Sequence, residues 1–514
     1  MKADVLVAEI GSTTTVVSAF DLAAPRFLGH GLAPTTVLTG DVNVGLRQAI
    51  ADLRYHLRRE GPMAPGEGLT WNQMLATSSA AGGLRMTVHG LVYDMTVKAA
   101  REAALGAGAI LKMVTAGVLG DRQLAHVAEL RPNIILLAGG VDHGERATVV
   151  ANARCLAELA GRGSAGWRAP VIFAGNVDAR DEVLEILGAA GIKVFPVENV
   201  YPRIDELNVE PTRRVIQEVF EEHIVVAPGM DKIRQMVTGR IIPTPGAVMT
   251  AAQALYQRLG DLVVIDVGGA TTDVHSVTEG SEEVQRVTVS PEPLAKRTVE
   301  GDLGVYLNAR NIVELCGAST VARVMGEMLR ADAIPVGATS ATSTTSTTST
   351  TSASSADASS ADASAAVTAD EVQALLARRP LFPLDGRERA YVEALTAEAV
   401  RVALLRHAGQ LRYMYGAGGR KTIAEGKDLT RVRWLIGTGG PLTQLPVGQK
   451  ILARIPGYGH GRELLPRAEA RALVDRDYIM AACGVLCAAG HPGTATELLL
   501  ESLGIGRAVE VISG

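Results

Sequence analysis

Two stretches of the sequence share one pattern and decide the fold: residues 6–18, LVAEIGSTTTVVS, and residues 263–275, VVIDVGGATTDVH. Each runs from an apolar strand through a carboxylate, an apolar residue, a glycine and two small residues to a Thr-Thr pair and a second strand. The two stretches lie about half of the 514-residue chain apart. Self-similarity at a distance of this kind indicates a duplicated domain.

A second pair of similar stretches supports the duplication. Residues 134–140 read IILLAGG and residues 434–440 read WLIGTGG, and each is an apolar strand that ends in glycines. Each of these stretches follows its Thr-Thr hairpin after a similar number of residues, if the low-complexity segment 338–366 is not counted. We therefore predict two equivalent lobes, one in residues 1–245 and one in residues 246–514.

The composition places the chain among globular α/β proteins. Hydrophobic residues make up 47% and charged residues 20%, which is enough apolar material for sizeable cores. Short apolar runs alternate with helix-length amphipathic stretches, as in α/β architecture. The clearest predicted strands are Val5–Ile10, Ile134–Ala138, Val171–Ala174, Leu262–Val267 and Trp434–Ile436.

Charge, cysteine content and hydropathy exclude several classes of protein. A net charge of −5 argues against a nucleic-acid partner held through phosphate contacts. Four cysteines are too few for a secreted disulfide framework. No apolar run reaches the roughly 20 residues that span a bilayer, and the N-terminal residues do not look like a targeting segment. We expect a cytoplasmic protein without nucleic-acid or membrane partners.

One segment of low complexity interrupts the second predicted lobe. Residues 338–366 contain only Ala, Ser, Thr and Asp, so they cannot bury enough apolar surface to offset their ordering entropy. We predict a disordered loop there. Thr368 and Glu371 then have the spacing of a capping box, which predicts a helix over 372–378.

The repeated hairpins have the composition of a phosphate site. Glycine lets the backbone approach an anion closely, the N–H groups of a tight turn form an anion-binding concavity, and hydroxyls add donors. The predicted phosphate-binding residues are Gly11, Ser12, Thr13, Thr14 and Thr15 in the first hairpin and Gly268, Gly269, Ala270, Thr271 and Thr272 in the second. A plain hairpin with a glycine bulge is the alternative, and two copies make it less favoured.

The carboxylate of each hairpin has a separate predicted role. A carboxylate placed directly against phosphate would be repelled, so Glu9 and Asp266 are predicted to hold Mg²⁺ through water and to be the catalytic residues. The turn formed by Gly437, Thr438, Gly439 and Gly440 follows a strand and leaves room for an adenine or ribose. A tight strand-to-helix crossover is the alternative for that turn.

At these points the sequence resembles the ATPase superfamily of actin, Hsp70 and the sugar kinases. Glu9–Thr15 matches its phosphate-1 hairpin, Asp266–Thr272 its phosphate-2 hairpin and Gly437–Leu442 its adenosine turn, while 246–254 and 478–489 look like its small-residue connecting helices. The resemblance implies duplicated actin-like (ribonuclease H-like) ATPase domains with a nucleotide cleft between the lobes. This chain has Glu9 where the superfamily usually has Asp, which we expect to shift Mg²⁺ and to slow hydrolysis.

Six further strings resemble the glutamate mutase (methylaspartate mutase) accessory family. They lie at residues 78–84, 104–109, 137–142, 197–200, 207–211 and 297–304. The resemblance implies an ATP- and Mg²⁺-dependent, chaperone-like reactivating factor whose client is an adenosylcobalamin-dependent mutase or aminomutase. In that context Gly301 and Asp302 are expected to face the nucleotide, and Asp302 to cap a helix.

Two other functions fit the same fold. A small-molecule kinase of the sugar-kinase type needs a substrate-activating carboxylate, and no segment singles one out. An actin-like filament protein needs self-assembly surfaces, which the sequence does not reveal, so the oligomeric state stays open. Cys483 and Cys487 share a helix face and are interpreted as buried thiols rather than cluster ligands.

Overall fold

The computed structural model describes residues 1–505 except 37–40, 60–62, 65, 80–83, 108, 163–168, 225–229, 290–291, 334–365, 382, 384 and 417–418. The predicted disordered loop, residues 338–366, therefore lies outside the described residues except for Ala366. In the described part of the chain, no helix combines the length and apolar character needed to cross a membrane.

Two five-stranded sheets have the same strand order and the same strand directions. The sheet of lobe I contains β10 (Ile241–Pro243), β4 (Thr70–Ser78), β1 (Lys2–Ile10), β2 (Thr14–Asp21) and β3 (Arg26–Pro34), in that order. The sheet of lobe II contains β17 (Arg471–Val474), β16 (Trp434–Thr438), β11 (Leu262–Val267), β12 (Thr272–Val277) and β13 (Ala295–Glu300), in that order. The duplicated, actin-like α/β fold predicted from the sequence is confirmed.

The register shows which residues of the two lobes are equivalent. Glu9 in β1 lies opposite Thr77 in the parallel strand β4, and Asp266 in β11 lies opposite Thr438 in the parallel strand β16. Both hairpin turns are closed by the same hydrogen bond, from Gly11 N–H to Thr14 O (3.0 Å) and from Gly268 N–H to Thr271 O (2.9 Å). The repeat read from these hairpins is therefore a real structural duplication.

The predicted equivalence of residues 134–140 and 434–440 is wrong. Residues 134–137 form β7 (Ile134–Leu137), which belongs to a third sheet, and the lobe I counterpart of β16 is β4. Apolar strands followed by glycine are common in parallel sheets, so this pattern alone does not identify equivalent strands.

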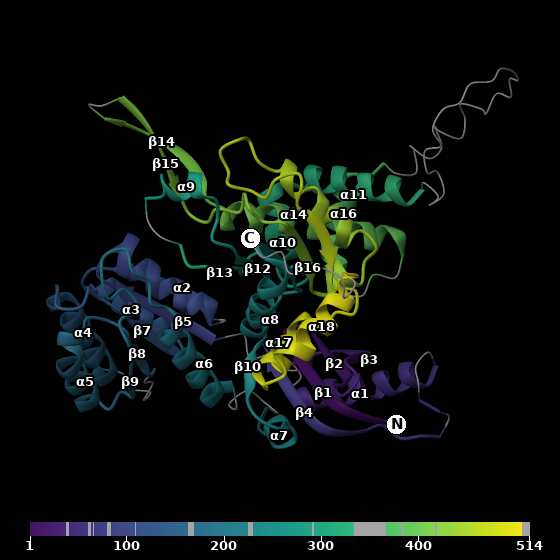
Figure 1. Ribbon diagram of the computed structural model, residues 1–514, viewed down its shortest axis with the longest axis horizontal. Helices are drawn as coiled ribbons and strands as arrows, with labels where there is room; N and C mark the ends of the chain where they lie inside the picture. The colour runs from purple at the N-terminus through teal and green to yellow at the C-terminus, as the bar shows by residue number, and fades with distance from the viewer. Residues whose placement is uncertain are drawn as a thin grey trace, which may run out of the picture.

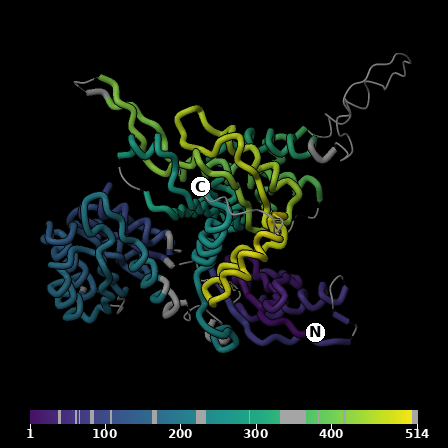
Figure 2. The backbone as a smooth tube through the Cα atoms, in the orientation of Figure 1, coloured from purple at the N-terminus to yellow at the C-terminus, as the bar shows by residue number. Residues whose placement is uncertain are grey.

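The third sheet belongs to an insertion in lobe I, residues 84–209, which we call the inserted domain. Its strands are all parallel and lie in the order β6 (Ala109–Ala116), β5 (Leu84–Gly90), β7, β8 (Val171–Phe173) and β9 (Val194–Pro196). Figures 1 and 2 show it as a separate body beside the two lobes, with α3 (Asp121–Leu130), α4 (Ala147–Arg162) and α5 (Arg180–Ala189) around it. Residues 1–245 thus hold two sheets, and the boundary at residue 245 stays a prediction.

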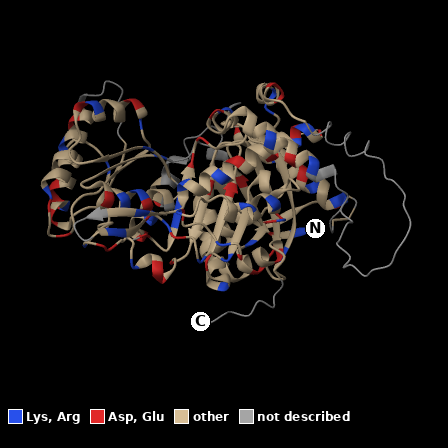
Figure 3. Cartoon of the chain, turned by 90° about the horizontal axis from the view of Figure 1, so that it is seen from above, with Lys and Arg blue, Asp and Glu red and all other residues tan. Residues whose placement is uncertain are grey.

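The remaining helices pack around the sheets, and Figure 3 shows many Lys, Arg, Asp and Glu positions along them. Lobe I carries α1 (Val42–Arg59) and α7 (Met230–Met236). The inserted domain begins with the π-helix η2 (Tyr93–Val97) and α2 (Lys98–Gly106), and α6 (Glu210–Ile224) leads from it back to lobe I. Lobe II carries α9 (Glu282–Gln285), α10 (Ala309–Cys316), α11 (Ala318–Ala333), α13 (Ala369–Arg378), α14 (Gly386–His407), α15 (Gly440–Thr443), α16 (Gly448–Ala453) and the hairpin β14 (Gln410–Gly416)–β15 (Gly419–Glu425). Half of the predicted capping box is present: Thr368 Oγ1 accepts a hydrogen bond from Glu371 N–H (3.2 Å), whereas the Glu371 carboxylate accepts hydrogen bonds from Arg387 (2.6 and 2.8 Å).

Two helices rich in small residues join the lobes, as predicted. They are α8 (Thr244–Leu259) and α17 (Met480–Ala488), and α18 (Pro492–Ser502) follows the second of them (Figure 1). One apolar core combines their side chains with those of β1 and β11. The helices cross so closely that a Cβ added to Gly484 would lie 1.9 Å from the carbonyl oxygen of Ala247.

Gly484→Ala should therefore destabilise the protein. The methyl group cannot fit without separating α8 from α17, so we expect a loss of about 2 kcal/mol in the free energy of unfolding, measured by urea titration. Gly188→Ala in α5 is the control, because its added Cβ meets open space. That control should change stability little or raise it by about 0.5–1 kcal/mol. Equal stability of the two variants would contradict the close crossing.

Candidate functional site

The turns of the two hairpins touch each other between the lobes. A Cβ added to Gly269 in the lobe II turn would lie 2.7 Å from Oγ1 and 2.9 Å from Cγ2 of Thr13 in the lobe I turn. Within the described residues, the N–H groups of Ser12, Thr13, Gly269 and Ala270 make no hydrogen bond. Unpaired N–H donors on two adjoining turns are an arrangement that can bind an anion.

The carbonyl groups of the lobe II turn point the other way. Gly268 O accepts a hydrogen bond from Val305 N–H (3.2 Å), and Gly269 O accepts from Tyr306 N–H (3.0 Å) and Leu307 N–H (2.7 Å). The segment 305–307 therefore fixes the turn from behind. A turn held in this way keeps its N–H groups in place without any ligand.

Most of the predicted hydroxyl donors already have partners in the protein. Their hydrogen bonds are Ser12 Oγ to Ser79 O (3.2 Å), Thr15 Oγ1 with Thr35 Oγ1 (2.9 Å), Thr272 Oγ1 to Leu303 O (2.7 Å) and Thr438 Oγ1 to Asp475 Oδ2 (3.0 Å). The Thr271 hydroxyl hydrogen-bonds the Asp273 carboxyl. These groups position the turns, whereas the hydroxyls of Thr13 and Thr14 show no hydrogen bond within the described part of the chain.

The two predicted catalytic carboxylates lie behind the turns. Burial is the largest cause that raises the pKa of Glu9 to about 8, and the charges of Asp266 and Asp475 raise it further. Burial likewise raises the pKa of Asp266 to about 7; the neighbouring Asp273 and Asp475 raise it too, while Arg297 opposes the shift. Glu9 and Asp266 are thus close enough to repel each other.

A third acidic residue, Asp475, follows β17, is fully buried and was not predicted from the sequence. Its carboxylate accepts hydrogen bonds from Met480 N–H (2.8 Å), the Ser502 hydroxyl (2.7 Å) and the Thr438 hydroxyl. Burial also raises its pKa. The signal in the sequence was an acidic residue shortly before the second connecting helix, which is a place where helix-capping residues are also found.

The adenosine turn lies directly against Asp266. Gly439 has φ +85°, and a Cβ added there would lie 2.6 Å from Asp266 Oδ1 and 2.2 Å from Val267 O. Gly437 and Thr438 end β16, and Gly440 begins the short helix α15. Only glycine can occupy position 439, because any side chain would displace the carboxylate.

Gly301 and Asp302 lie in the loop after β13. Two oxygens of the Asp302 carboxylate accept hydrogen bonds from the Arg406 guanidinium (2.8 and 3.0 Å), which also binds Glu300 (2.6 Å). The prediction that Asp302 caps a helix is wrong, because the next helix, α10, begins after Asn308. The predicted contact of Gly301 and Asp302 with the nucleotide stays a prediction.

The donor set fits a hard divalent cation. Glu9 and Asp266 are buried carboxyl groups with raised pKa values, the charge of Asp266 raises the pKa of Glu9, and a cation near both would offset their burial and repulsion. The described residues contain no group of three or more His, Cys, Asp or Glu side chains that could ligate a metal directly. An ion held mainly through water agrees with both observations.

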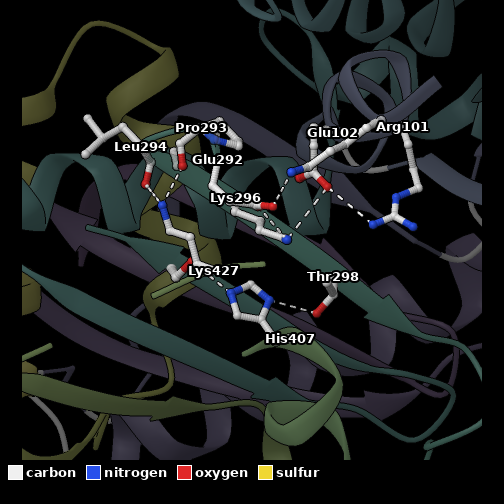
Figure 4. A network of polar contacts seen from close by, with 12 residues as sticks. Arg101, Glu102, Glu292, Pro293, Leu294, Lys296, Thr298, His407 and Lys427 are labelled. Atoms are coloured by element: carbon white, nitrogen blue, oxygen red, sulfur yellow. Dashed lines mark hydrogen bonds and ion pairs between the residues drawn. The ribbon is translucent and has the colours of Figure 1, made fainter. Parts of the chain in front are cut away.

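A buried ion pair and a polar network connect this site to the inserted domain. Arg297 in β13 donates to Asp273 Oδ1 (3.2 Å) and to Leu105 O in α2 (2.8 Å). Nearby, Glu292 pairs with both Lys98 of α2 and Lys296 of β13 (2.6 Å each), as Figure 4 shows in part. The network therefore ties α2 to the strand beside the lobe II hairpin.

Lys427 and His407 extend this network into lobe II (Figure 4). The Lys427 ammonium donates to three backbone carbonyls, and burial lowers its pKa to about 8. His407 hydrogen-bonds the hydroxyls of Ser276 (2.8 Å) and Thr298 (2.9 Å), and burial holds its pKa well below the usual value. At the α2 end, the Glu102 carboxylate lies 3.6 Å from Arg101 and 4.0 Å from Lys296 without a hydrogen bond in the described part of the chain. Nε of Arg297 also has no hydrogen-bond partner within the described residues.

The raised pKa values predict that the ligand-free protein loses stability as the pH rises. Glu9 and Asp266 bind protons more tightly in the folded chain than in the unfolded chain, so their stabilising protonated state disappears as the pH passes from about 4 to about 8. Asp266→Asn removes one of these charges. We expect the variant and the wild type to have similar stability near pH 4 and the variant to be more stable by about 4 kcal/mol at pH 8 in urea unfolding, because the pKa of Asp266 is raised from 3.8 to about 7. If the free energies of unfolding of the wild type and the variant changed with pH in the same way, the raised pKa of Asp266 would be contradicted.

Comparison with known proteins identifies relatives over nearly the whole chain. The model of a family described as MutL protein matches residues 5–503. Protein MutL of Clostridium tetanomorphum is 33% identical over 507 residues, which cover 97% of this chain and 98% of that protein.

Matches to solved structures have low sequence identity. Nucleotide-free acetone carboxylase is 14% identical, with 94% of this chain and 70% of that chain covered and a TM-score of 0.36. The diol dehydratase-reactivating factor in nucleotide-free form is 10% identical, with 96% and 100% covered and a TM-score of 0.32. Xylulose kinase of Bifidobacterium adolescentis is 14% identical, with 95% and 94% covered and a TM-score of 0.28.

Proposed function

The chain belongs to the MutL protein family, and from its site and its sequence resemblances we propose that it is an ATP-dependent reactivating factor for an adenosylcobalamin-dependent mutase. In this proposal Mg-ATP binds between the lobes, and its hydrolysis drives exchange of damaged cobalamin on a client of the glutamate mutase or aminomutase type. The protein acts in the cytoplasm as a chaperone-like ATPase.

The observation that carries the proposal is the contact between the two equivalent turns. Thr13 in lobe I and Gly269 in lobe II lie against each other, and the N–H group of each is unpaired within the described residues, so a polyphosphate is expected to bridge the lobes. Gly437 to Gly440 would accommodate the nucleoside beside Asp266. Because each lobe supplies one turn, binding and release of nucleotide would close and open the space between them.

Glu9 and Asp266 would hold Mg²⁺, which when bound would neutralise phosphate charge and lower the pKa of both carboxylates. Asp475 would act as a positioning residue. Its hydrogen bond to the Thr438 hydroxyl (3.0 Å) fixes the end of the strand next to β11, and its charge contributes to the raised pKa of Glu9.

The test is ATP turnover by the purified chain, with and without a purified adenosylcobalamin-dependent glutamate mutase inactivated by damaged cofactor. We expect turnover that needs Mg²⁺, rises with the mutase and restores mutase activity. Turnover that responds instead to a sugar would favour the kinase, and ATP-dependent sedimentation would favour the filament. Absence of ATP binding would remove the proposal altogether.

A further inference from the structure

One edge of the inserted domain exposes apolar side chains from several loops. All five strands of its sheet are parallel, so their carboxyl ends meet at the same edge. Five large apolar residues in the segments after β5, β6, β8 and β9 are exposed, and we call them the apolar edge. They are Val92 (43% exposed), Tyr93 (54%), Val118 (57%), Val177 (38%) and Ile204 (70%).

The strand order spreads these residues in a row. With neighbouring strands about 4.8 Å apart, the edge from β6 to β9 is about 20 Å long. Val141, in the segment after β7 at the middle of the row, is itself only partly buried. Single exposed apolar residues are ordinary on protein surfaces, but a row from four loops at the ligand-binding edge of a parallel sheet is typical of an interaction site.

Hydrogen bonds hold three of the loops in fixed positions. Asp142 Oδ1 accepts from Val177 N–H (3.0 Å) and from Asn199 Nδ2 (2.9 Å), and Asp142 N–H donates to Pro202 O (3.0 Å). Asn176 adds a bond to Gly144 O (3.1 Å). The loops that carry Val177 and Ile204 are therefore tied to each other, which lowers the conformational entropy lost on binding there.

One residue in this frame has a strained backbone. His143 has φ +61°, a backbone conformation that residues other than glycine rarely adopt. Its Nδ1 lies 3.2 Å from the Asp178 carboxylate. Its backbone N–H donates to Asn176 Oδ1 (3.2 Å). Strain of this kind persists where the surrounding structure enforces it and is frequent at functional surfaces.

The charges around the row are mainly negative. In segments 91–97, 117–120, 138–146, 174–179 and 197–206, six exposed acidic residues outnumber two exposed basic ones. The acidic residues are Asp94, Glu145, Asp178, Glu198, Asp205 and Glu206, and the basic ones are Arg146 and Arg203. A second copy of this chain would meet the same acidic rim and be repelled, whereas a surface rich in Lys and Arg would be attracted.

We propose that the apolar edge docks a partner protein whose contact face combines apolar side chains with an excess of Lys and Arg. This inference rests on the proposed function: the partner is the client mutase, which binds the inserted domain while ATP binds between the lobes. The edge lies outside the nucleotide site, because none of its residues belongs to the hairpins or to the adenosine turn.

The test measures the affinity of the full chain for a purified adenosylcobalamin-dependent glutamate mutase by biolayer interferometry. We expect Ile204→Asp and Val118→Asp each to weaken binding at least tenfold without changing ATP affinity. Leu315→Asp is the matched control, because Leu315 is similarly exposed (52%) on α10 of lobe II. Affinity should fall as salt rises, and Asp94→Lys should weaken binding at low salt and reduce this salt dependence.

Each contrary result has its own meaning. Mutase binding that is indifferent to Ile204→Asp would place docking elsewhere and leave the proposed function standing. A chain that binds ATP but no mutase would overturn both the docking surface and the choice of client. If sedimentation shows a wild-type dimer that Ile204→Asp dissociates, a second copy covers the edge and the proposal is wrong.

Discussion

Asp266→Ala is expected to remove most Mg²⁺-dependent ATP hydrolysis while nucleotide binding remains measurable. The N–H groups of Gly269 and Ala270, which would bind phosphate, belong to the backbone and survive the substitution. The lost carboxylate would leave the metal without its lobe II partner. We expect turnover to fall about 100-fold, which corresponds to a barrier increase of about 3 kcal/mol, in a mutase-stimulated ATPase assay.

Two further variants make this result specific. Asp261→Ala removes a carboxylate just before the opposite end of the same strand, where it pairs with Arg431 (3.9 Å), and should leave turnover unchanged. Glu9→Asp tests the longer side chain of lobe I. Unchanged or faster turnover in Glu9→Asp would mean that the longer side chain of Glu9 slows hydrolysis. Slower turnover would mean that the site is adapted to the longer side chain. Unchanged turnover in Asp266→Ala would exclude Asp266 from the mechanism.

Gly269→Val is expected to abolish ATP binding, with at least a 100-fold loss of affinity in calorimetry. The first added carbon alone would lie 2.7 Å from Thr13 Oγ1, so the branched side chain must push the two turns apart. The four unpaired N–H groups could then no longer converge on one polyphosphate. The overall fold should persist, because both turns lie outside the sheets and their helices.

A size-compensating pair checks that the loss arises from this contact. Gly269→Ala should weaken ATP binding less than valine does, and Thr13→Gly combined with Gly269→Ala should recover part of the affinity by reopening the space. Gly457→Ala is a neutral control, because a Cβ there meets nothing within 4 Å. If Gly269→Val still bound ATP with nearly native affinity, the phosphate-2 assignment would fail.

The hairpins and the connecting helices could be predicted because their local chemistry is specific. The pattern around Asp266 fixes strand, turn and strand within thirteen residues, and β11 has the predicted bounds, Leu262–Val267. The small residues of α8 and α17 signalled a close crossing, and Gly484 lies at that crossing.

Other features depend on long-range pairing that no local pattern encodes. The inserted domain escaped prediction because β7 reads like any buried parallel strand, and only its neighbours in the sheet show where it belongs. Asp475 escaped because a capping carboxylate and a site carboxylate look alike in sequence. Its role emerges only from its burial and from its effect on the pKa of Glu9.

The position of the insertion also sets the order in which lobe I can fold. The chain leaves β4 after Ser78 and returns to the same edge in β10, where Pro243 pairs beside Ser78. The last strand of the sheet is therefore synthesised only after the whole inserted domain, whose own strand pairings are more local. On the ribosome, the inserted domain can fold as a unit while lobe I still lacks its outermost strand. During that interval β4 presents an unpaired edge, and an unpaired strand edge is a template for aggregation.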